Sequence, residues 1–169
     1  MDVSHAIRGR RSIRKFESRD LPEEKLMEVL EAGRWAPSAS NFQPWRFIVV
    51  RDERIRKELA RVSSYGKFMT QSPVVIAVTV DPGSSNHPVE DGAAATQNML
   101  LAAHALGLGT CWIGSFDSVW EDQAKKILDI PEDKRLLSLV AVGYPAEKGS
   151  SSRKPLGDMV CYDRYTWKR

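Results

Sequence analysis

Residues 36–45 read Ala-Pro-Ser-Ala-Ser-Asn-Phe-Gln-Pro-Trp, and this stretch carries the strongest indication of the fold. Two prolines bracket a run of short side chains that form hydrogen bonds. A turn between a helix and a strand commonly contains proline and asparagine. A turn alone does not explain why two serines, an asparagine and a glutamine occur together just before a strand. We therefore expect a stiff loop whose polar groups face a polar heterocycle.

A helix and a strand are predicted on the two sides of this loop. Residues 22–35 form the helix, because Pro22 suits a first helical position, acidic residues follow it, and apolar residues repeat on one face. The helix ends before Pro37, since the residue before a proline is pushed out of helical geometry. Runs of β-branched and aromatic residues predict buried strands at 45–50 and 74–80.

The rest of the chain completes an α+β pattern. Small and apolar residues from 93 to 103 predict that a helix at 88–106 is buried nearly all round, and a second subunit would make that burial easier. Shorter helices are expected at 3–9, 53–62 and 119–128, a third strand at 136–142, and loops at 63–71 and 150–152. We predict one domain over residues 1–169: a small central mixed sheet flanked by helices, with one long buried helix.

Composition limits the class of protein. A chain of 169 residues can bury a full core, and 42% hydrophobic and 28% charged residues are ordinary for a soluble globular domain. A net charge of +3 argues against a nucleic-acid partner. No stretch approaches the roughly 20 apolar residues of a membrane span, and the first residues lack the apolar core of a signal peptide. The two cysteines have no metal-ligand spacing. A cytoplasmic protein without a metal or a membrane partner is expected.

Positive charge gathers in two short segments. Residues 8–15 contain four arginines and a lysine, and Arg153 and Lys154 form the second cluster. A guanidinium group binds phosphate through two hydrogen bonds in a planar fork, and the hydroxyl of Ser12 adds a further donor. Taken alone, the first cluster is more typical of a solvated basic loop or a nucleic-acid patch than of a phosphate site.

Five motifs together resemble the FMN-dependent nitroreductase family. They are Arg-Arg-Ser-x-Arg at 10–14, Ala-Pro-Ser-x-x-Asn-x-Gln-Pro-Trp at 36–45, Gly-x-Gly-Thr-Cys-Trp-Ile-Gly at 107–114, Val-Gly-Tyr-Pro at 142–145 and Arg-Lys-Pro-Leu at 153–156. The similarity spans residues 5–156 in the right order. It implies a small member with a short lid and an intertwined homodimer, in which a C-terminal arm of about residues 157–169 packs on the partner subunit.

The resemblance also implies which residues bind FMN. Arg10, Arg11 and Ser12 would hold the phosphate and the ribityl chain. Arg14 would lie near the pyrimidine edge of the ring, where a fixed cation stabilises the negative charge that reduction brings. Lys67 matches a position that often assists at that edge. The resemblance further places Cys111, Trp112, Ile113 and Gly114 against the ring near N5, Arg153 and Lys154 on the phosphate, and Pro37, Ser38, Ala39, Ser40, Asn41 and Gln43 in the partner's site.

The activity implied is an NAD(P)H-dependent oxidoreductase. NADH or NADPH would reduce FMN, and an organic acceptor such as a nitroaromatic or a quinone would then take the electrons in a ping-pong mechanism. Cys111 and His104 lie in apolar segments and are interpreted as packing residues, and Glu90 and Asp91 as partners of a helix dipole. Two alternatives stay open: a specialised reductase or dehydrogenase on the same fold, and a flavin-binding redox or carrier module with little turnover.

Overall fold

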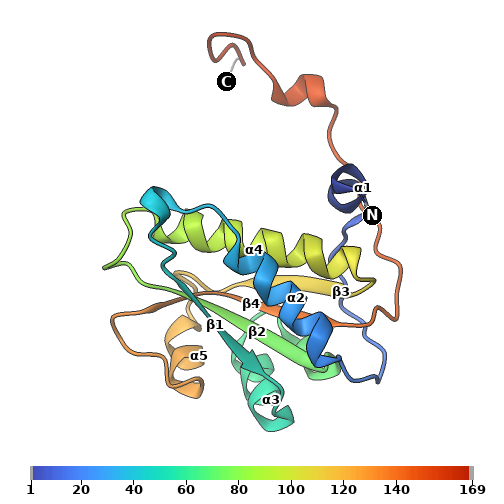
Figure 1. The fold of residues 1–169 in the computed structure, drawn as a ribbon, viewed down its shortest axis with the longest axis vertical. Helices are drawn as coiled ribbons and strands as arrows, with labels where there is room; N and C mark the ends of the chain where they lie inside the picture. Colours follow the sequence, from blue (N-terminus) through green and yellow to red (C-terminus); the bar gives the residue numbers. More distant parts are fainter. Residues whose placement is uncertain (1, 168–169) are drawn as a thin grey trace.

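A four-stranded antiparallel sheet forms the centre of the computed structural model, which describes residues 2–167. Its strands lie in the order β1 (Trp45–Val50), β2 (Val74–Val80), β4 (Arg135–Gly143) and β3 (Gly109–Gly114). The central strands β2 and β4 are buried along nearly their whole length, because helices cover both faces of the sheet (Figure 1). This explains why their sequences are almost continuously apolar and do not alternate as in a sheet with one wet face.

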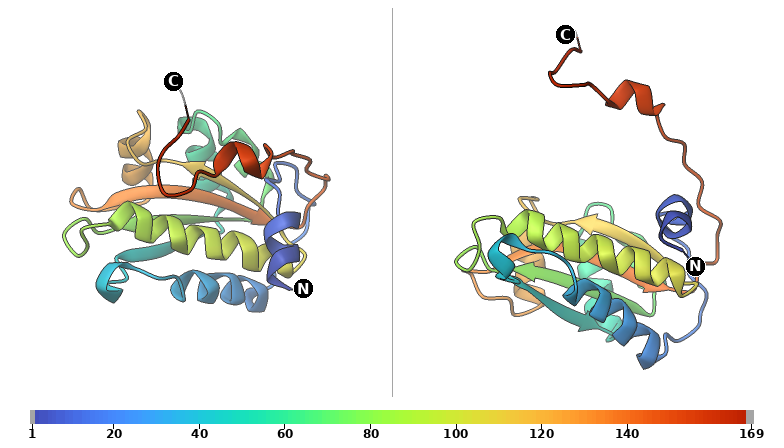
Figure 2. Two further views of the ribbon diagram at one scale, coloured as in Figure 1. Left: turned by 90° about the horizontal axis from the view of Figure 1, so that it is seen from above. Right: turned by 45° about the horizontal axis from the view of Figure 1, so that its top comes forward.

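Two layers of helices enclose the sheet. On one face lie α2 (Glu23–Arg34) and α4 (Pro88–Ala105), and on the other lie α3 (Glu53–Val62) and α5 (Glu121–Ile127), as Figures 1 and 2 show. The short helix α1 (Val3–Gly9) lies by the C-terminal end of α4. Three single turns of tighter helix complete the list: η1 (Ala39–Asn41), η2 (Lys67–Gln71) and η3 (Leu156–Met159). No helix within residues 2–167 is long and apolar enough to cross a membrane.

The long helix α4 packs directly on the sheet. A Cβ at Gly92 would lie 2.5 Å from the side chain of Val80 and 2.6 Å from that of Leu137, so only glycine permits this approach. Its inner face, which includes Met99, is fully buried. Four residues of the other faces are only half-buried: Ala93, Ala94, Leu101 and Ala102. The expected burial nearly all round is therefore incomplete within one chain.

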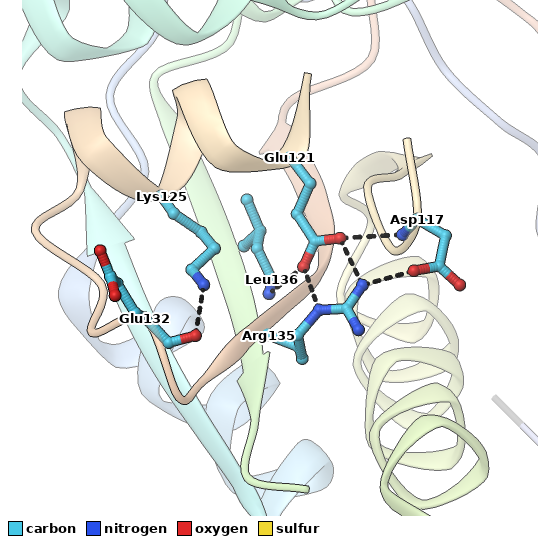
Figure 3. Close-up of polar contacts among 6 residues, drawn as sticks. All are labelled: Asp117, Glu121, Lys125, Glu132, Arg135 and Leu136. Carbon is cyan, nitrogen blue, oxygen red and sulfur yellow. Dashed lines mark hydrogen bonds and ion pairs between the residues drawn. The ribbon is translucent and has the colours of Figure 1, made fainter. Parts of the chain in front are cut away.

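A network of charged groups ties α5 to the start of β4. Arg135 donates to the two carboxylate oxygens of Glu121, each at 2.8 Å, and to Asp117 at 2.6 Å (Figure 3). Glu121 also accepts hydrogen bonds from the N–H groups of Asp117 and Leu136, at 2.8 and 3.0 Å. Only 5% of the Glu121 side chain is exposed, so these bonds compensate for burying its charge.

The predicted α+β class is confirmed, and the expected helices and strands agree with the structure to within two residues. Three expectations are wrong in detail. No strand was predicted at the position of β3, because this short segment has a glycine at each end. Residues 63–71 are not a plain loop, since they contain η2. The sheet is not mixed: its strands pair antiparallel, and the parallel contact is an isolated bridge between Ser12 and Thr110.

Candidate functional site

The backbone of the basic segment, residues 10–17, is held on one side by β3. The N–H of Ile13 donates to the carbonyl oxygen of Thr110 at 2.8 Å, next to the bridge between Ser12 and Thr110. The side chain of Ile13 packs over Gly109, where a Cβ would come within 2.9 Å of it. The glycine therefore allows the basic segment to lie directly against the first residue of the strand.

Glu147 holds the same segment on its other side. Its Oε1 accepts hydrogen bonds from the N–H groups of Arg14 and Lys15, at 2.6 and 3.2 Å. The carboxylate thus fixes the backbone beneath the exposed side chain of Arg14. Within residues 2–167 no carboxylate forms an ion pair with the guanidinium of Arg14. Its charge is available to a ligand.

Two hollows open beside the basic segment. The first has a volume of about 320 Å³ and is lined by Arg10, Arg11, His104 and Lys148, among others. The second, of about 250 Å³, is lined by Arg14, Tyr65, Phe68 and the four residues 111–114 of β3. The first hollow therefore has two arginines and a lysine in its wall, together with Glu147 and apolar residues, and the second combines a single arginine with aromatic and apolar side chains.

Three cations, Arg10, Arg11 and Lys148, line the first hollow beside one carboxylate, Glu147, whose Oε1 accepts hydrogen bonds from backbone N–H groups. Burial lowers the pKa of Arg10, and so do the nearby charges of Arg153 and Arg11. Burial also lowers the pKa of His104, with further contributions from the charges of Arg10 and Arg11. Mutual repulsion of this kind costs free energy in the empty protein, and a bound anion would remove that cost.

Cys111 does not supply a reactive thiolate to the second hollow. Burial raises the pKa of its thiol, against the opposing effect of the Arg14 charge. A buried thiol that stays protonated is a poor nucleophile. The expectation that Cys111 packs rather than reacts agrees with this environment.

The loop at residues 37–43 lies at the opposite end of α4. The N–H of Ala39 donates to Asp91, in the first turn of the helix, at 2.8 Å. His104, in the last turn, lies against Gly9 and lines the first hollow. His104 follows Asp91 by thirteen positions, which is about 20 Å of α-helix. The loop and the basic segment therefore do not meet within one chain.

This loop has an unusual backbone. Ser40, Asn41 and Gln43 adopt left-handed φ angles of 47°, 57° and 52°. The hydroxyl oxygen of Ser38 accepts the N–H of Gln43 at 3.0 Å, and the Gln43 amide donates to the carbonyl of Asn41 at 3.1 Å. Non-glycine residues in this region are strained, and such strain is typical of functional sites.

A larger hollow lies elsewhere in the described chain. It has a volume of about 720 Å³ and is bounded by α2 and β1, with Met27, Leu30 and Phe47 in its wall. Neither basic motif contributes to it. A phosphate-bearing ligand is therefore better matched to the two smaller hollows.

Comparison with known proteins identifies the family, since the model of the Nitroreductase family matches residues 7–65 and 61–144. This chain belongs to the nitroreductase family. A Methanothermobacter thermautotrophicus protein, provisionally named NADH dehydrogenase/NAD(P)H nitroreductase, is 41% identical over 153 residues, covering 87% of this chain and 79% of that protein. A crystal structure with the same provisional name, from Bacteroides thetaiotaomicron, has a TM-score of 0.92 at 32% identity and covers 96% of this chain and 97% of its own. A provisionally named nitroreductase from Desulfovibrio desulfuricans, in complex with FMN, has a TM-score of 0.85 at 37% identity and covers 98% and 99%.

The basic motif at 10–14 lies beside the motif at 107–114 within the single chain, and Arg153 lies near Arg10. Arg10, Arg11 and Ser12 lie beside β3. Lys154 follows at the base of the exposed C-terminal segment. Arg14 shares the second hollow with Cys111, Trp112, Ile113 and Gly114. The resemblance noted in the sequence is confirmed, and the role of each of these residues toward a ligand stays a prediction.

Two groups of expected residues do not line either hollow beside the basic segment. Lys67 is exposed in η2, and its neighbours Tyr65 and Phe68, not Lys67 itself, line the second hollow. The loop residues are remote from the basic segment in the same chain: Pro37, Ser38, Ala39, Ser40, Asn41 and Gln43.

Sequence reasoning missed several residues of the nitroreductase site. The aromatic residues Tyr65 and Phe68 flank Lys67 and could have been noticed beside it. Glu147 gave no signal, because its partner Arg14 lies 133 residues away in the chain. Asp91 was assigned only to the helix dipole, although its side chain holds the loop.

Proposed function

We propose that this protein is an FMN-dependent oxidoreductase that takes electrons from NADH or NADPH and passes them to small organic acceptors such as nitroaromatics or quinones. The observation that carries the proposal is the pair of hollows beside the basic segment, one with Arg10, Arg11 and Lys148 in its wall and the other with Arg14 and aromatic and apolar side chains. The names of the relatives, and the FMN in one of their structures, support it.

The residues present fit FMN. Arg10, Arg11, Arg153 and Lys154 supply enough positive charge for one terminal phosphate dianion. The chain lacks the glycine-rich turn that typically binds the pyrophosphate of a dinucleotide. In the second hollow, aromatic and apolar side chains would suit a flat ring, and Arg14 lies in the same wall.

When bound, FMN supplies two-electron redox chemistry between a nicotinamide and an acceptor. The role of Arg14 is to hold a positive charge where the reduced ring carries negative charge. Glu147 accepts hydrogen bonds from the N–H groups of Arg14 and Lys15 and so fixes the backbone from which this side chain extends. Cys111 stays protonated and does not compete as a nucleophile. Donor and acceptor occupy the same open hollow in turn, which gives ping-pong kinetics.

The working unit of this proposal is a homodimer in which each flavin site takes residues 37–43 from the partner subunit. Three observations support it: the distance of this loop from Arg14 in one chain, the half-buried outer rows of α4, and an exposed C-terminal arm. The arm extends away from the body in Figure 1. It presents exposed apolar side chains that a partner would cover: Leu156, Met159, Val160, Tyr162 and Tyr165. The last residues of the expected arm, 168–169, lie outside the described part. The free cysteines Cys111 and Cys161 support a place in a reducing cytoplasm.

The test is the cofactor content and turnover of the purified protein. We expect a yellow protein that releases FMN, and not FAD, on heating. It should oxidise NADH or NADPH with menadione or a nitrofuran, and double-reciprocal plots should be parallel. A protein that stays colourless after incubation with excess FMN, with no change in melting temperature, would refute the proposal.

A further inference from the structure

Asp91 joins three parts of the chain through one buried carboxylate. It is 5% exposed, in the first turn of α4. Its Oδ1 accepts the N–H of Ala39 at 2.8 Å, and its Oδ2 accepts the hydroxyl of Ser85 at 2.6 Å. The hydroxyl oxygen of Ser85 accepts the N–H of His87 at 3.0 Å. The carboxylate therefore connects the loop 37–43, the turn before α4, and α4 itself.

A helix-dipole role does not account for these contacts. A carboxylate can complement a dipole while exposed to water, as the neighbouring Glu90 is. Burying a carboxylate is costly unless hydrogen bonds or cations compensate for the lost hydration. Within residues 2–167 no cation forms an ion pair with Asp91, and both of its oxygens are committed to neutral donors. The geometry therefore indicates that the function of the buried Asp91 carboxylate is to accept these two hydrogen bonds.

The loop held by Asp91 is the strained one. Residues in left-handed geometry persist only where the surroundings fix them, and Ser40, Asn41 and Gln43 all adopt it. The other hydrogen bonds of this loop stay inside it. Among the hydrogen bonds of the described residues, the one from Ala39 to Asp91 ties residues 37–43 to another element.

We propose that Asp91 is a positioning residue, which holds the loop 37–43 in the conformation that contacts the flavin of the partner subunit. The proposal rests on the proposed function, because it assigns the loop a flavin to contact. Without the carboxylate, the N–H of Ala39 loses its acceptor and the loop relaxes from its left-handed geometry. The partner's site then loses Asn41 and Gln43, although its own phosphate contacts are unchanged.

The experiment compares three variants of the full-length protein. Asp91→Ala removes both acceptors, Asp91→Asn keeps the size and one acceptor oxygen, and Glu90→Ala is the matched control one residue away on the exposed side. The first readout is the Kd for FMN, measured by quenching of its fluorescence. The second is the rate at which chymotrypsin cuts the apoprotein after Phe42, which is 52% exposed in the loop. The melting temperature and the size of each apoprotein are recorded alongside.

We expect Asp91→Ala to weaken FMN binding roughly tenfold or more and to speed cleavage after Phe42, because a hydrogen bond to a charged group is lost. Asp91→Asn should retain most of the affinity for FMN and most of the resistance to cleavage, and Glu90→Ala should match the wild type. An unchanged Kd in Asp91→Ala would overturn the proposal. So would an equal loss in the alanine and asparagine variants, with a lower melting temperature and no faster cleavage, since that pattern indicates a purely structural role.

Two further outcomes are distinguishable. If wild-type protein binds no FMN, the proposed function fails, and the assignment of the loop to a flavin fails with it, whatever the cleavage rates. If Asp91→Ala does not fold, Ser85→Ala takes its place, because it removes only the hydroxyl that orients the carboxylate. Smaller increases in the Kd for FMN and in the rate of cleavage after Phe42 are then expected. Wild-type values of both quantities would overturn the proposal.

Discussion

At the scale of single residues, Arg14 and Arg10 carry similar charge but are proposed to act at different stages. Arg14 lines the second hollow, beside aromatic and apolar side chains, and Arg10 lines the first. A positive charge that pairs with the phosphate would stabilise the bound flavin equally before and after the flavin is reduced. A charge at the ring contributes more once the ring is reduced, and it therefore affects the rate of that step.

We predict that Arg14→Ala slows reduction of the flavin by NADH roughly tenfold or more while changing the Kd for FMN less. Arg10→Ala should do the reverse. Lys15→Ala is the matched control, because Lys15 is adjacent, exposed and bound to Glu147 through its backbone alone. Stopped-flow absorbance measures the reduction rate, and fluorescence titration measures the Kd. Equal losses of FMN in both arginine variants would remove the distinction between ring and phosphate contacts.

At the scale of elements, the junction between α5 and β4 depends on the ionised form of Glu121. Burial alone would raise the pKa of this carboxyl, but hydrogen bonds from Arg135 and from the N–H groups of Asp117 and Leu136 outweigh it, so the net pKa is lowered. A carboxyl whose pKa is lower in the folded state stabilises the protein above its ordinary pKa. That stabilisation is lost as the pH falls through the lowered value.

We predict that Glu121→Gln lowers the free energy of unfolding by about 2 kcal/mol at pH 7, since it weakens a buried charge-assisted network. The difference from wild type should shrink as the pH falls below about 4, where the glutamate begins to take up a proton in the unfolded chain. Asp122→Asn, at the exposed next position of α5, is the control. Urea unfolding at several pH values measures the effect. A difference that stays constant down to acid pH would contradict the assignment.

Some of the helices and strands could be predicted from the sequence, and others could not. Helix α2 could be predicted from the repeat of its apolar residues on one face and from the proline at its start. Helix α4 could be predicted from its long run of small and apolar residues and from the proline at its start. Strand β3 was missed, since it is six residues long with a glycine at each end. The cationic and loop motifs were found from their residue types and their resemblance to the family. Their placement at opposite ends of α4, and the contacts from Glu147 and Asp91, depend on tertiary structure that no local pattern encodes.

At the scale of the whole molecule, the proposed dimer makes each site from two chains. A twofold interface repeats every contact, so one site takes Arg14 from one subunit and Asn41 from the other. The test uses one substitution at Arg14 and another at Asn41, each chosen because it abolishes the activity of its own homodimer. A mixed dimer of the two has one site with both defects and one with neither.

We predict that unfolding the two variants together and refolding the mixture restores about a quarter of wild-type activity, because random pairing makes half of the dimers mixed. Each variant refolded alone is the control. Size-exclusion chromatography confirms that dimers form, and NADH oxidation measures the recovery. Dimers that re-form from the mixture without activity would show that each site lies within one chain.

In the proposed dimer, the separation of the two half-sites by α4 would also couple cofactor occupancy to assembly. The twelve residues between Asp91 and His104 would prevent a single chain from closing both half-sites around one flavin. Mass action then links the two equilibria: FMN shifts monomers toward dimer, and dilution below the dimer dissociation constant releases FMN. If the proposed dimer forms, the quantity of flavin retained by the protein is a function of the protein's own concentration, and a shortage of flavin would leave more of this chain as monomer.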